Sequence, residues 1–325
     1  MMLSSVAERI YWLGRYLERV ENTARLVNVY ASMLLDLPRD TNIGWGTLID
    51  IIGCNEAYEK TKDSLEEKPI IRFLLADTRN GSSLMSSVIA MRENARTTRE
   101  IIPAEAWELI NNLYLHMKDS IARTGSRRGR QQLLETVVGE CQRIFGLVAA
   151  SMNHDSTYAF VQLGRKVERA DMTSRMVDVG SISLLPEFNR DANQRQLLEP
   201  YENVVWMNVL RCLGGYQAYR QAARNHVRGE DVVRFLLQDT EFPRAIGYCL
   251  NDIDKYLRLL PNHDEVLQAV ARVKKITTTV SVSELLERGL LDFIDELQIS
   301  VADIHEAISL AWFHPEEWRA IKSVD

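Results

Sequence analysis

The sequence lacks several features that define large classes of proteins. Its 325 residues contain no apolar run that approaches the roughly 20 residues of a membrane-spanning helix. The N-terminal segment lacks the apolar core of a signal peptide. The four cysteines lie far apart and form no Cys-x-x-Cys pair, so we expect reduced, mostly buried thiols and no disulfide framework. These absences favour a folded cytoplasmic protein without a membrane segment.

Motifs for metals, phosphates and reactive nucleophiles are absent as well. The six histidines form neither a His-x-His nor a His-Glu-x-x-His pattern. They also supply no Glu-x-x-His pair, which a di-metal site in a helical bundle would use. No glycine-rich phosphate loop and no Gly-x-Ser-x-Gly elbow occurs. The sequence therefore predicts neither a resident metal nor a cofactor, and it contains no self-sufficient catalytic motif.

Acidic residues exceed basic ones in the sequence, 45 to 39. The formal net charge of -6 argues against a dedicated nucleic-acid binder, whose domains usually carry a basic excess. The one dense basic run extends from Arg123 to Arg130. A loop between helices is the more common explanation of such a run, and a phosphate-binding patch is the alternative.

What the sequence does contain is an internal repeat. Residues 13–27 return in altered form as residues 163–177, with the glycine, the Glu-Arg pair and the flanking arginines in register. Two later pairs of segments follow in the same order, namely 45–58 with 206–219 and 71–78 with 233–240. Three matching segments in one order indicate a tandem duplication. The extra residues of the second copy fall within 178–200, which we interpret as an inserted loop.

The periodicity predicts an all-α fold. Apolar residues recur at helical spacing, prolines fall between the periodic segments, and no alternating strand pattern is evident. We expect a helical bundle made of two tandem, pseudo-twofold-related halves without a β-sheet, the first half spanning 1–153 and the second 154–325. Because the junction at 152–160 is short and lacks linker composition, the halves should form one continuous unit.

Helix boundaries follow from caps and breakers. Ser5-x-x-Glu8 has the pattern of a capping box, Ser82-Ser83 a cap, and Pro103 and Pro315 are good first positions of a helix or turn. The helices are expected over about 5–35, 43–62, 84–102, from 103, 131–152, 243–260, 264–280 and 282–313.

The repeated segments place arginines and a glutamate on one polar helix face. On a helical wheel, Arg15, Glu18 and Arg25 lie opposite an apolar stripe, with Arg19 beside them. The candidate site residues from both copies are Arg15, Glu18, Arg19, Arg25, Arg165, Glu168, Arg169 and Arg175.

Three interpretations of this face remain open. A single copy would be explained by a ladder of salt bridges on a helix surface. Retention in both copies favours either glutamates that brace arginines where the halves meet, or a cleft in which the arginines bind a carboxylate or phosphate. Bracing is somewhat favoured. The arginines outnumber the facing carboxylate, however, which leaves room for an anionic ligand.

A second polar cluster consists of Arg92, Glu93, Asn94 and Arg96. Its second-half counterpart at 254–258 keeps only the last arginine, so an activity at this cluster would belong to one half alone. Sequence drift on an exposed helix face explains the difference between the halves equally well.

The sequence resembles the bacterial alpha-E domain family, a helical domain with a Glu-Arg motif. The resemblance depends on Ala7-Glu8-Arg9 and residues 11–22, and extends over essentially the whole chain. Further matches are Arg92-Glu93-Asn94-Ala95-Arg96, Leu163-Gly164-Arg165-x-x-Glu168-Arg169-Ala170-Asp171 and Phe293-x-x-Glu296-Leu297-Gln298.

The resemblance implies a genomic association with a circularly permuted ATP-grasp protein and a transglutaminase-like peptidase. The function it implies is that of an accessory protein in peptide synthesis or modification, which binds the ligase or its anionic peptide substrate. One alternative is an enzyme of the same pathway with Glu18 or Glu93 as general base. The other is a purely structural scaffold. The family supplies no agreed catalytic positions.

Overall fold

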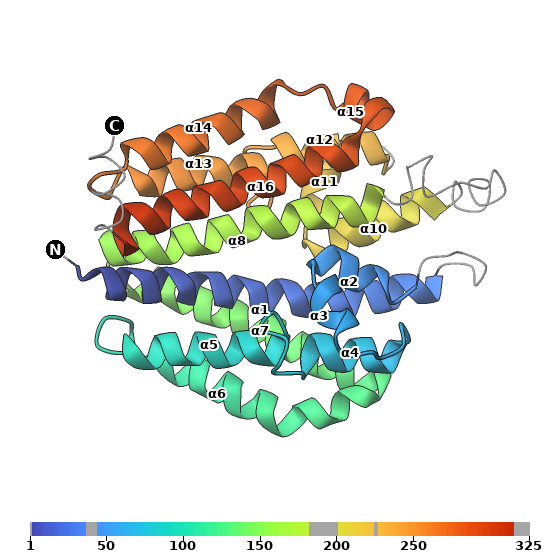
Figure 1. The fold of residues 1–325 in the computed structure, drawn as a ribbon, viewed down its shortest axis with the longest axis horizontal. Helices are drawn as coiled ribbons and strands as arrows, with labels where there is room; N and C mark the ends of the chain where they lie inside the picture. The colour runs from blue at the N-terminus through green and yellow to red at the C-terminus, as the bar shows by residue number, and fades with distance from the viewer. Residues whose placement is uncertain (1, 37–43, 182–200, 224–226, 315–325) are drawn as a thin grey trace.

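The protein is helical throughout the part of the chain that the structure describes. The computed structural model describes residues 2–36, 44–181, 201–223 and 227–314 (Figure 1). Within these ranges no residue belongs to a β-strand. The predicted all-α fold class is therefore confirmed.

The first half of the chain forms one very long helix, three short ones and three further long ones. They are α1 (Ser4–Asp36), α2 (Thr47–Ile52), α3 (Asn55–Glu59), α4 (Glu67–Leu75), α5 (Leu84–Thr97), α6 (Ala104–Ser120), the 3-10 helix η1 (Ile121–Gly125) and α7 (Arg127–Ser151).

The second half has the same order of long and short helices. It contains α8 (Ser156–Ser181), α10 (Glu202–Cys212), α11 (Tyr216–Ala223), α12 (Gly229–Gln238), α13 (Ile246–Leu257), α14 (Asp264–Thr279), α15 (Val282–Arg288), α16 (Leu290–Ile308) and the π-helical turn η3 (Ser309–Phe313).

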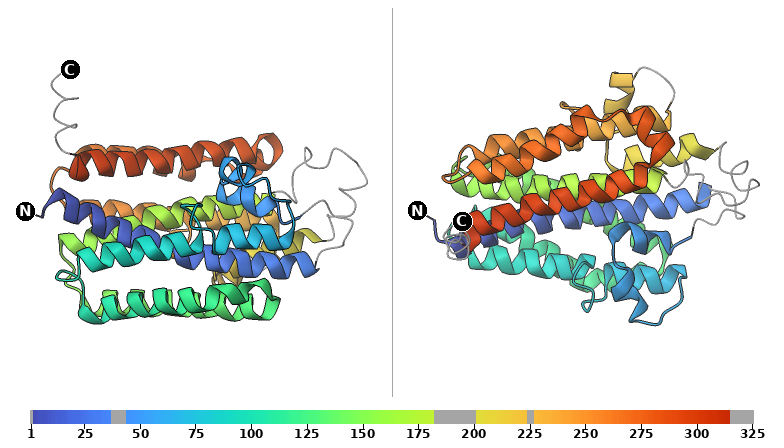
Figure 2. Two further views of the ribbon diagram at one scale, coloured as in Figure 1. Left: turned by 60° about the horizontal axis from the view of Figure 1, so that its bottom comes forward. Right: turned by 45° about the horizontal axis from the view of Figure 1, so that its top comes forward.

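Each half forms a bundle of four long helices. In the first, α1 and α6 each pack on α5 and α7; in the second, α8 and α14 each pack on α13 and α16. The two bundles meet along α1 and α8, which lie side by side in the middle of the molecule (Figures 1 and 2). Short helices cross this boundary, since α2 packs on α8 and α10 packs on α1. The buried apolar residues form one cluster that extends over both halves.

The central position of α1 explains why its polar face is not in solvent. A helix at the surface of a globular protein normally exposes its polar face. In α1 the apolar Leu17 and Val20 are buried, and so are the charged Glu18 and Glu21, with 0% and 1% exposure. The arginine–glutamate face therefore packs against α8 instead of facing water.

Two predicted helices are interrupted at glycines. The expected helix over 43–62 is two helices, because Gly53 ends α2 with a φ of 71°. The expected helix over 282–313 is broken at Gly289, which has a φ of 147°. Positive φ is readily available only to glycine, and it stops the run of i to i−4 hydrogen bonds. Helical periodicity continues across both breaks, which is why the pattern alone missed them.

The other helix boundaries differ less from the predicted ones. Ser83 caps α5 by accepting a hydrogen bond from the Ser86 amide, and Pro103 directly precedes α6, as expected. However, α5 ends at Thr97 and not at 102, and α7 begins at Arg127, four residues before its predicted start. The turn predicted at Pro315 and most of the predicted inserted loop lie outside the described residues.

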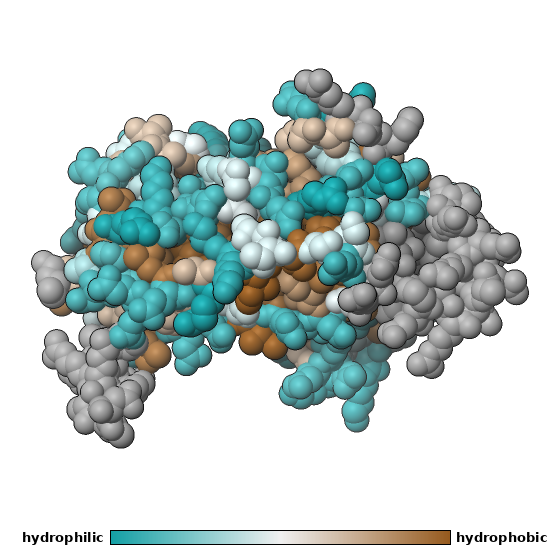
Figure 3. Space-filling view, turned by 90° about the horizontal axis from the view of Figure 1, so that it is seen from above, coloured by the Kyte–Doolittle hydropathy of each residue, from teal (hydrophilic) through white to brown (hydrophobic). Residues whose placement is uncertain are grey.

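The surface on the α14 side is largely hydrophilic, with apolar areas between the polar side chains (Figure 3). Three of the large apolar side chains exposed in the second half are Leu259, Ile276 and Ile299. Among the described helices, none has the length and apolarity required to cross a lipid bilayer.

Candidate functional site

Two glycines let α1 and α8 approach to backbone contact. A Cβ atom placed on Gly14 would lie 2.2 Å from the carbonyl oxygen of Val161, and one on Gly164 would lie 2.0 Å from that of Tyr11. Each glycine thus contacts the helix that carries the other. Later residues of α1 also meet later residues of α8, as Glu18 does with Arg169. The helices therefore run parallel, with matching positions of the two repeats at the same level.

Glu168 of α8 receives two arginines from α1. The Arg19 guanidinium donates two hydrogen bonds, from Nε to Oε1 at 2.5 Å and from Nη2 to Oε2 at 2.9 Å. Arg15 Nε donates to Oε2 at 2.8 Å. Such paired, charge-assisted hydrogen bonds fix the geometry of both groups.

Glu18 of α1 receives the equivalent arginines from α8. Arg169 donates from Nε to Oε1 and from Nη2 to Oε2, both at 2.7 Å, and Arg165 Nε donates to Oε2 at 3.1 Å. Each glutamate thus binds the two arginines at the matching positions of the other helix. The pair expected within one helix, Arg15 with Glu18, does not form, because each partner is engaged across the interface.

A third arginine breaks the symmetry. Arg244, in the connection between α12 and α13, donates to Glu18 Oε1 at 2.9 Å, to Asn22 Oδ1 at 2.6 Å and to Glu21 at 2.7 Å. At the aligned position the first half has Ser82. Glu168 therefore lacks the third arginine that Glu18 has.

The last arginine of each repeat extends the network outward. Arg25 donates to Glu21 one turn earlier at 2.8 Å, and Arg175 donates to Asp171 at 3.0 Å. Arg175 also donates to the carbonyl of Ile51 at 3.2 Å, beside the left-handed Gly53 that ends α2. The structure thus places all eight primary candidates in ion pairs on α1 and α8: one group around Glu18 and Glu21, one around Glu168, and the pair of Arg175 with Asp171.

Both glutamates are fully ionised at neutral pH. Burial alone would raise the pKa of Glu18, but the charges of Arg169, Arg244 and Arg165 hold the pKa well below its usual range. Burial also opposes ionisation of Glu168, and the charges and hydrogen bonds of Arg19 and Arg15 lower the pKa of that carboxyl to about 2. Permanently charged acceptors are suited to holding guanidinium groups and poorly suited to taking a proton.

The arginines of the network outnumber its carboxylates. Seven arginines share four carboxylates, counting the ion pairs of Glu18, Glu21, Glu168 and Asp171. The outer arginines reach solvent, since the side chains of Arg19, Arg25, Arg165 and Arg175 are exposed by 22%, 18%, 21% and 24%. The interface therefore combines a buried, fixed centre with cationic groups at its edges.

Aromatic rings pack on the network, but with different partners on its two sides. Arg165 lies 3.5 Å from the centre of the Phe145 ring. On the Glu168 side, Tyr11 lies beside Arg15 and its hydroxyl is 3.0 Å from His305 Nδ1. Burial and the charge of Arg15 lower the pKa of His305 to about 4, so this imidazole is neutral at pH 7.

The secondary cluster on α5 is separate from this network. Arg92 donates to Asn111 at 2.8 Å and lies over the Tyr114 ring, while Glu93 and Arg96 form an exposed pair at 2.7 Å. Asn94 is half-buried. Among the described residues, no hydrogen bond or ion pair joins this cluster to the primary network.

Three partners in the network were missed by sequence reasoning. Arg244 gave no repeat signal, because its aligned residue is a serine. Glu21 and Asp171, by contrast, are acidic at aligned positions of the two copies, a signal that could have identified them. The buried ion pair of Lys166 with Asp252, at 2.5 Å, also has no sequence signature.

Other kinds of site are not evident in the described ranges. The cysteines Cys54, Cys141, Cys212 and Cys249 are buried and free. Within the same ranges, no three His, Cys, Asp or Glu side chains are grouped so that they could hold a metal ion. The cavities identified there, of about 530, 400, 380 and 10 Å³, are lined by residues other than the eight primary candidates.

Comparison with known proteins gives one family and a few distant relatives. The chain is 23% identical to uncharacterised proteins of Mycobacterium bovis and of two strains of Mycobacterium tuberculosis, over 93% of this chain and 35% of each relative. It thus spans about a third of the length of these relatives. No solved structure matches.

The family model of Alpha-E, described as a predicted alpha-helical domain with a conserved ER motif, matches residues 2–313. In this chain, Glu18-Arg19 and Glu168-Arg169 are the Glu-Arg pairs of the central network. Since the match covers nearly the whole chain, the protein belongs to the Alpha-E family.

Proposed function

We propose that this protein is a cytoplasmic accessory protein of an ATP-grasp-linked system for peptide synthesis or modification. Its role is to bind the circularly permuted ATP-grasp ligase, or the anionic peptide on which that ligase acts. The observation that supports this proposal best is the excess of arginines at the α1–α8 interface, together with the exposure of the outer ones.

The geometry of the network favours recognition of an anion. Arg25 and Arg175 are each held by a carboxylate on their own helix, and Arg175 also donates to the backbone carbonyl of Ile51. Guanidinium groups that are already fixed lose little conformational entropy when a carboxylate or phosphate binds. Their forked donors match such groups in two-point contacts.

General-base catalysis by Glu18 or Glu93 has less support. The pKa of Glu18 is held far below neutrality by three arginines, and the pKa of the exposed Glu93 is lowered by its hydrogen bond to Arg96. A good general base has a pKa near the working pH. The reciprocal pairing does support the alternative of a structural scaffold, in which the glutamates brace the arginines between the two halves. Bracing and recognition use different ends of the same network and are compatible.

The test is binding of the purified circularly permuted ATP-grasp protein from the same genome, measured by calorimetry. We expect a complex at micromolar concentrations. Arg25→Gln and Arg175→Gln together should weaken it at least tenfold, because each removes a charged donor worth about 1.5 to 3 kcal/mol.

The matched control is Arg258→Gln, which removes an exposed arginine from a similar i,i+4 pair with Asp254. It should leave binding unchanged. If neither the ligase nor its peptide product binds at about 100 μM, which corresponds to about −5.5 kcal/mol, the accessory function is refuted. A complex that is equally strong with the double variant would refute recognition through the outer arginines.

A further inference from the structure

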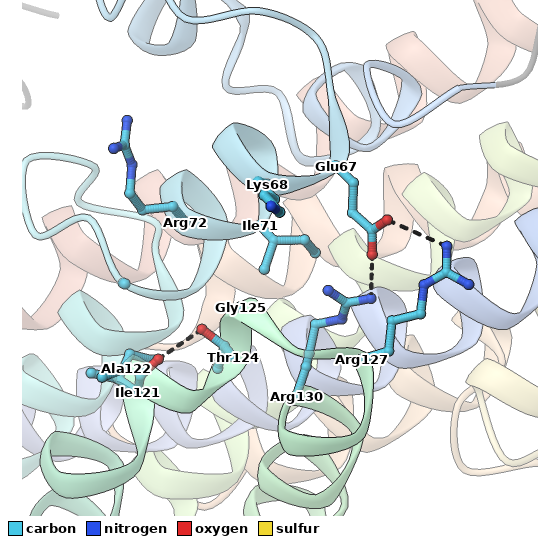
Figure 4. A pocket seen from close by; sticks show the side chains of 11 residues that line it. Glu67, Lys68, Ile71, Arg72, Ile121, Ala122, Thr124, Gly125, Arg127 and Arg130 are labelled. Carbon is cyan, nitrogen blue, oxygen red and sulfur yellow. Dashed lines mark hydrogen bonds and ion pairs between the residues drawn. The ribbon is translucent and has the colours of Figure 1, made fainter.

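A second candidate site lies outside the α1–α8 interface, between α4 and the segment formed by η1 and the start of α7. Here the structure has a cavity of about 530 Å³ (Figure 4). This volume is typical of pockets for small organic molecules. The basic run noted in the sequence, Arg123 to Arg130, forms one of its walls.

The cavity combines cationic groups with apolar surface. Four cationic residues line it, namely Lys68 and Arg72 of α4 and Arg127 and Arg130 of α7, while Glu67 is the acidic residue among its lining side chains. Arg72 is paired with Asp63 outside the lining, at 2.7 Å, so the uncompensated charge comes from the other three. Apolar surface comes from Ile71, Ala76, Ile121 and Ala122, on both walls.

One cation of the wall is buried and fixed. Arg130 is 5% exposed, donates to Glu67 at 2.7 Å and lies over the ring of Trp45. Glu67 also approaches Arg127, at 3.5 Å (Figure 4). One carboxylate thus serves two arginines, and Lys68 adds a further charge from the facing helix. An anionic group would offset this imbalance.

The equivalent positions in the second half carry different side chains, which form hydrogen bonds to neighbouring segments. Gln238, which aligns with Ala76, donates from Nε2 to the carbonyls of Thr277 and Val280, both at 3.0 Å. These bonds join α12 to the end of α14. Glu230, which aligns with Lys68, accepts a hydrogen bond from Ser283 at 2.8 Å. In the first half, the short Ala76 lines the cavity and has no polar group to form such bonds, and Lys68 reverses the charge.

We propose that this cavity binds a small organic anion, with a carboxylate or phosphate at its basic wall and a short apolar part against its isoleucines and alanines. The inference is independent of the function proposed for the α1–α8 interface. Carboxylate and phosphate ligands that fit this description share an anionic head group and an apolar part of a few carbon atoms.

Calorimetry and saturation-transfer NMR with three probes test the proposal. The probes are N-acetyl-leucyl-alanine, which ends in a carboxylate, its C-terminal amide, and hexyl phosphate. We expect at least one anionic probe to bind at least tenfold more tightly than the neutral amide. Preference for the peptide or for hexyl phosphate identifies the head group. Absence of binding of both anions at 5 mM, or equal binding of the amide, would overturn the proposal.

Two variants locate the binding. Ala76→Gln copies the second half and places a longer polar side chain in the lining of the cavity, so that binding should weaken at least tenfold. Lys68→Ala with Arg72→Ala should weaken it three- to tenfold while the fold is kept, because both side chains are exposed. Arg79→Ala removes an exposed arginine near α4 that does not line the cavity, and it is the matched control. Unchanged binding in Ala76→Gln would place the ligand elsewhere and refute the site.

Discussion

Replacement of Glu18 by glutamine would show how strongly the network stabilises the fold. The change removes one negative charge at the centre of the interface and alters the size of the side chain very little. Glu18 accepts from Arg165, Arg169 and Arg244 and is completely buried. In the glutamine variant one of the two oxygens is replaced by an NH2 group. Each oxygen accepts from two arginine N–H groups, so two of these donors would then face another donor.

The expected cost follows from the burial of the partners. Removal of one partner from a buried ion pair costs about 3 to 5 kcal/mol, because a charge is left without compensation. We expect Glu18→Gln to lower the free energy of unfolding by that amount. Glu168→Gln should cost less, about 2 kcal/mol, because Glu168 holds two arginines instead of three and the side chain of Arg19 is 22% exposed.

Urea unfolding followed by circular dichroism measures both losses. The control is Glu93→Gln, which breaks an exposed pair with Arg96 and should cost less than about 0.5 kcal/mol. The reasoning would be refuted if Glu18→Gln lowered the free energy of unfolding by less than about 1 kcal/mol, since removal of the central anion leaves several buried arginines without compensation. A larger loss for Glu168→Gln than for Glu18→Gln would refute the role assigned to Arg244.

Three further predictions concern packing and pH. Gly14→Ala should cost about 3 kcal/mol in chemical denaturation, because its Cβ would meet the Val161 carbonyl, whereas Gly139→Ala on α7 meets nothing within 4 Å and should stabilise by about 0.5 to 1 kcal/mol. Equal effects would argue against close helix contact.

The stability difference between wild type and Glu168→Gln should be constant above about pH 5. It should shrink as the pH falls from 4.5 toward 2, because the folded-state pKa of Glu168 is lowered to about 2. A difference that is the same at pH 3 and pH 7 in urea titrations would contradict this.

Burial raises the pKa of Asp178 to about 7, so the stability provided by its protonated form is full below pH 4 and lost as the pH rises through 7. Asp178→Asn should therefore melt above wild type at pH 8 and together with it at pH 4; the same offset at both pH values would exclude this titration.

The sequence predicted the fold class and the polar face well, for physical reasons. Apolar residues at helical spacing report the helices directly, and the repeat marked Glu18 and Glu168 before their positions were known. The breaks at Gly53 and Gly289 were missed because one residue with positive φ leaves the periodic pattern intact.

The pairing within the network could not be derived from one helix alone. At i,i+3 spacing, Arg15 and Glu18 suit each other, and only the contact made by Gly14 and Gly164 reveals that α8 supplies closer partners. The sequence repeat identifies α8 as a second helix with the same charges. It does not show that α8 runs parallel to α1, or which residues of the two helices lie side by side. Arg244 depends on tertiary folding entirely, since it lies 226 residues from Glu18.

In one pair of aligned segments and the residues beside it, the differences between the halves fall at polar or small positions. The aligned segments at 71–78 and 233–240 keep the packed apolar residues, for example Phe73 with Phe235, both buried. The aligned pairs that differ in charge or size include Ser82 with Arg244 and Ala76 with Gln238. The first pair changes how many cations a buried glutamate holds, and the second changes a residue in the lining of the cavity beside α4.

Packing alone explains why the apolar positions match, because a core of native density tolerates few changes of volume. Packing gives no comparable account of the polar positions, where the first half has Ser82 in place of Arg244 and Lys68 in place of Glu230. Binding of an anion would account for the basic side chains of the cavity beside α4, because the ligand would balance their charge. The asymmetry therefore directs experiments to the first half, where the cavity beside α4 lies.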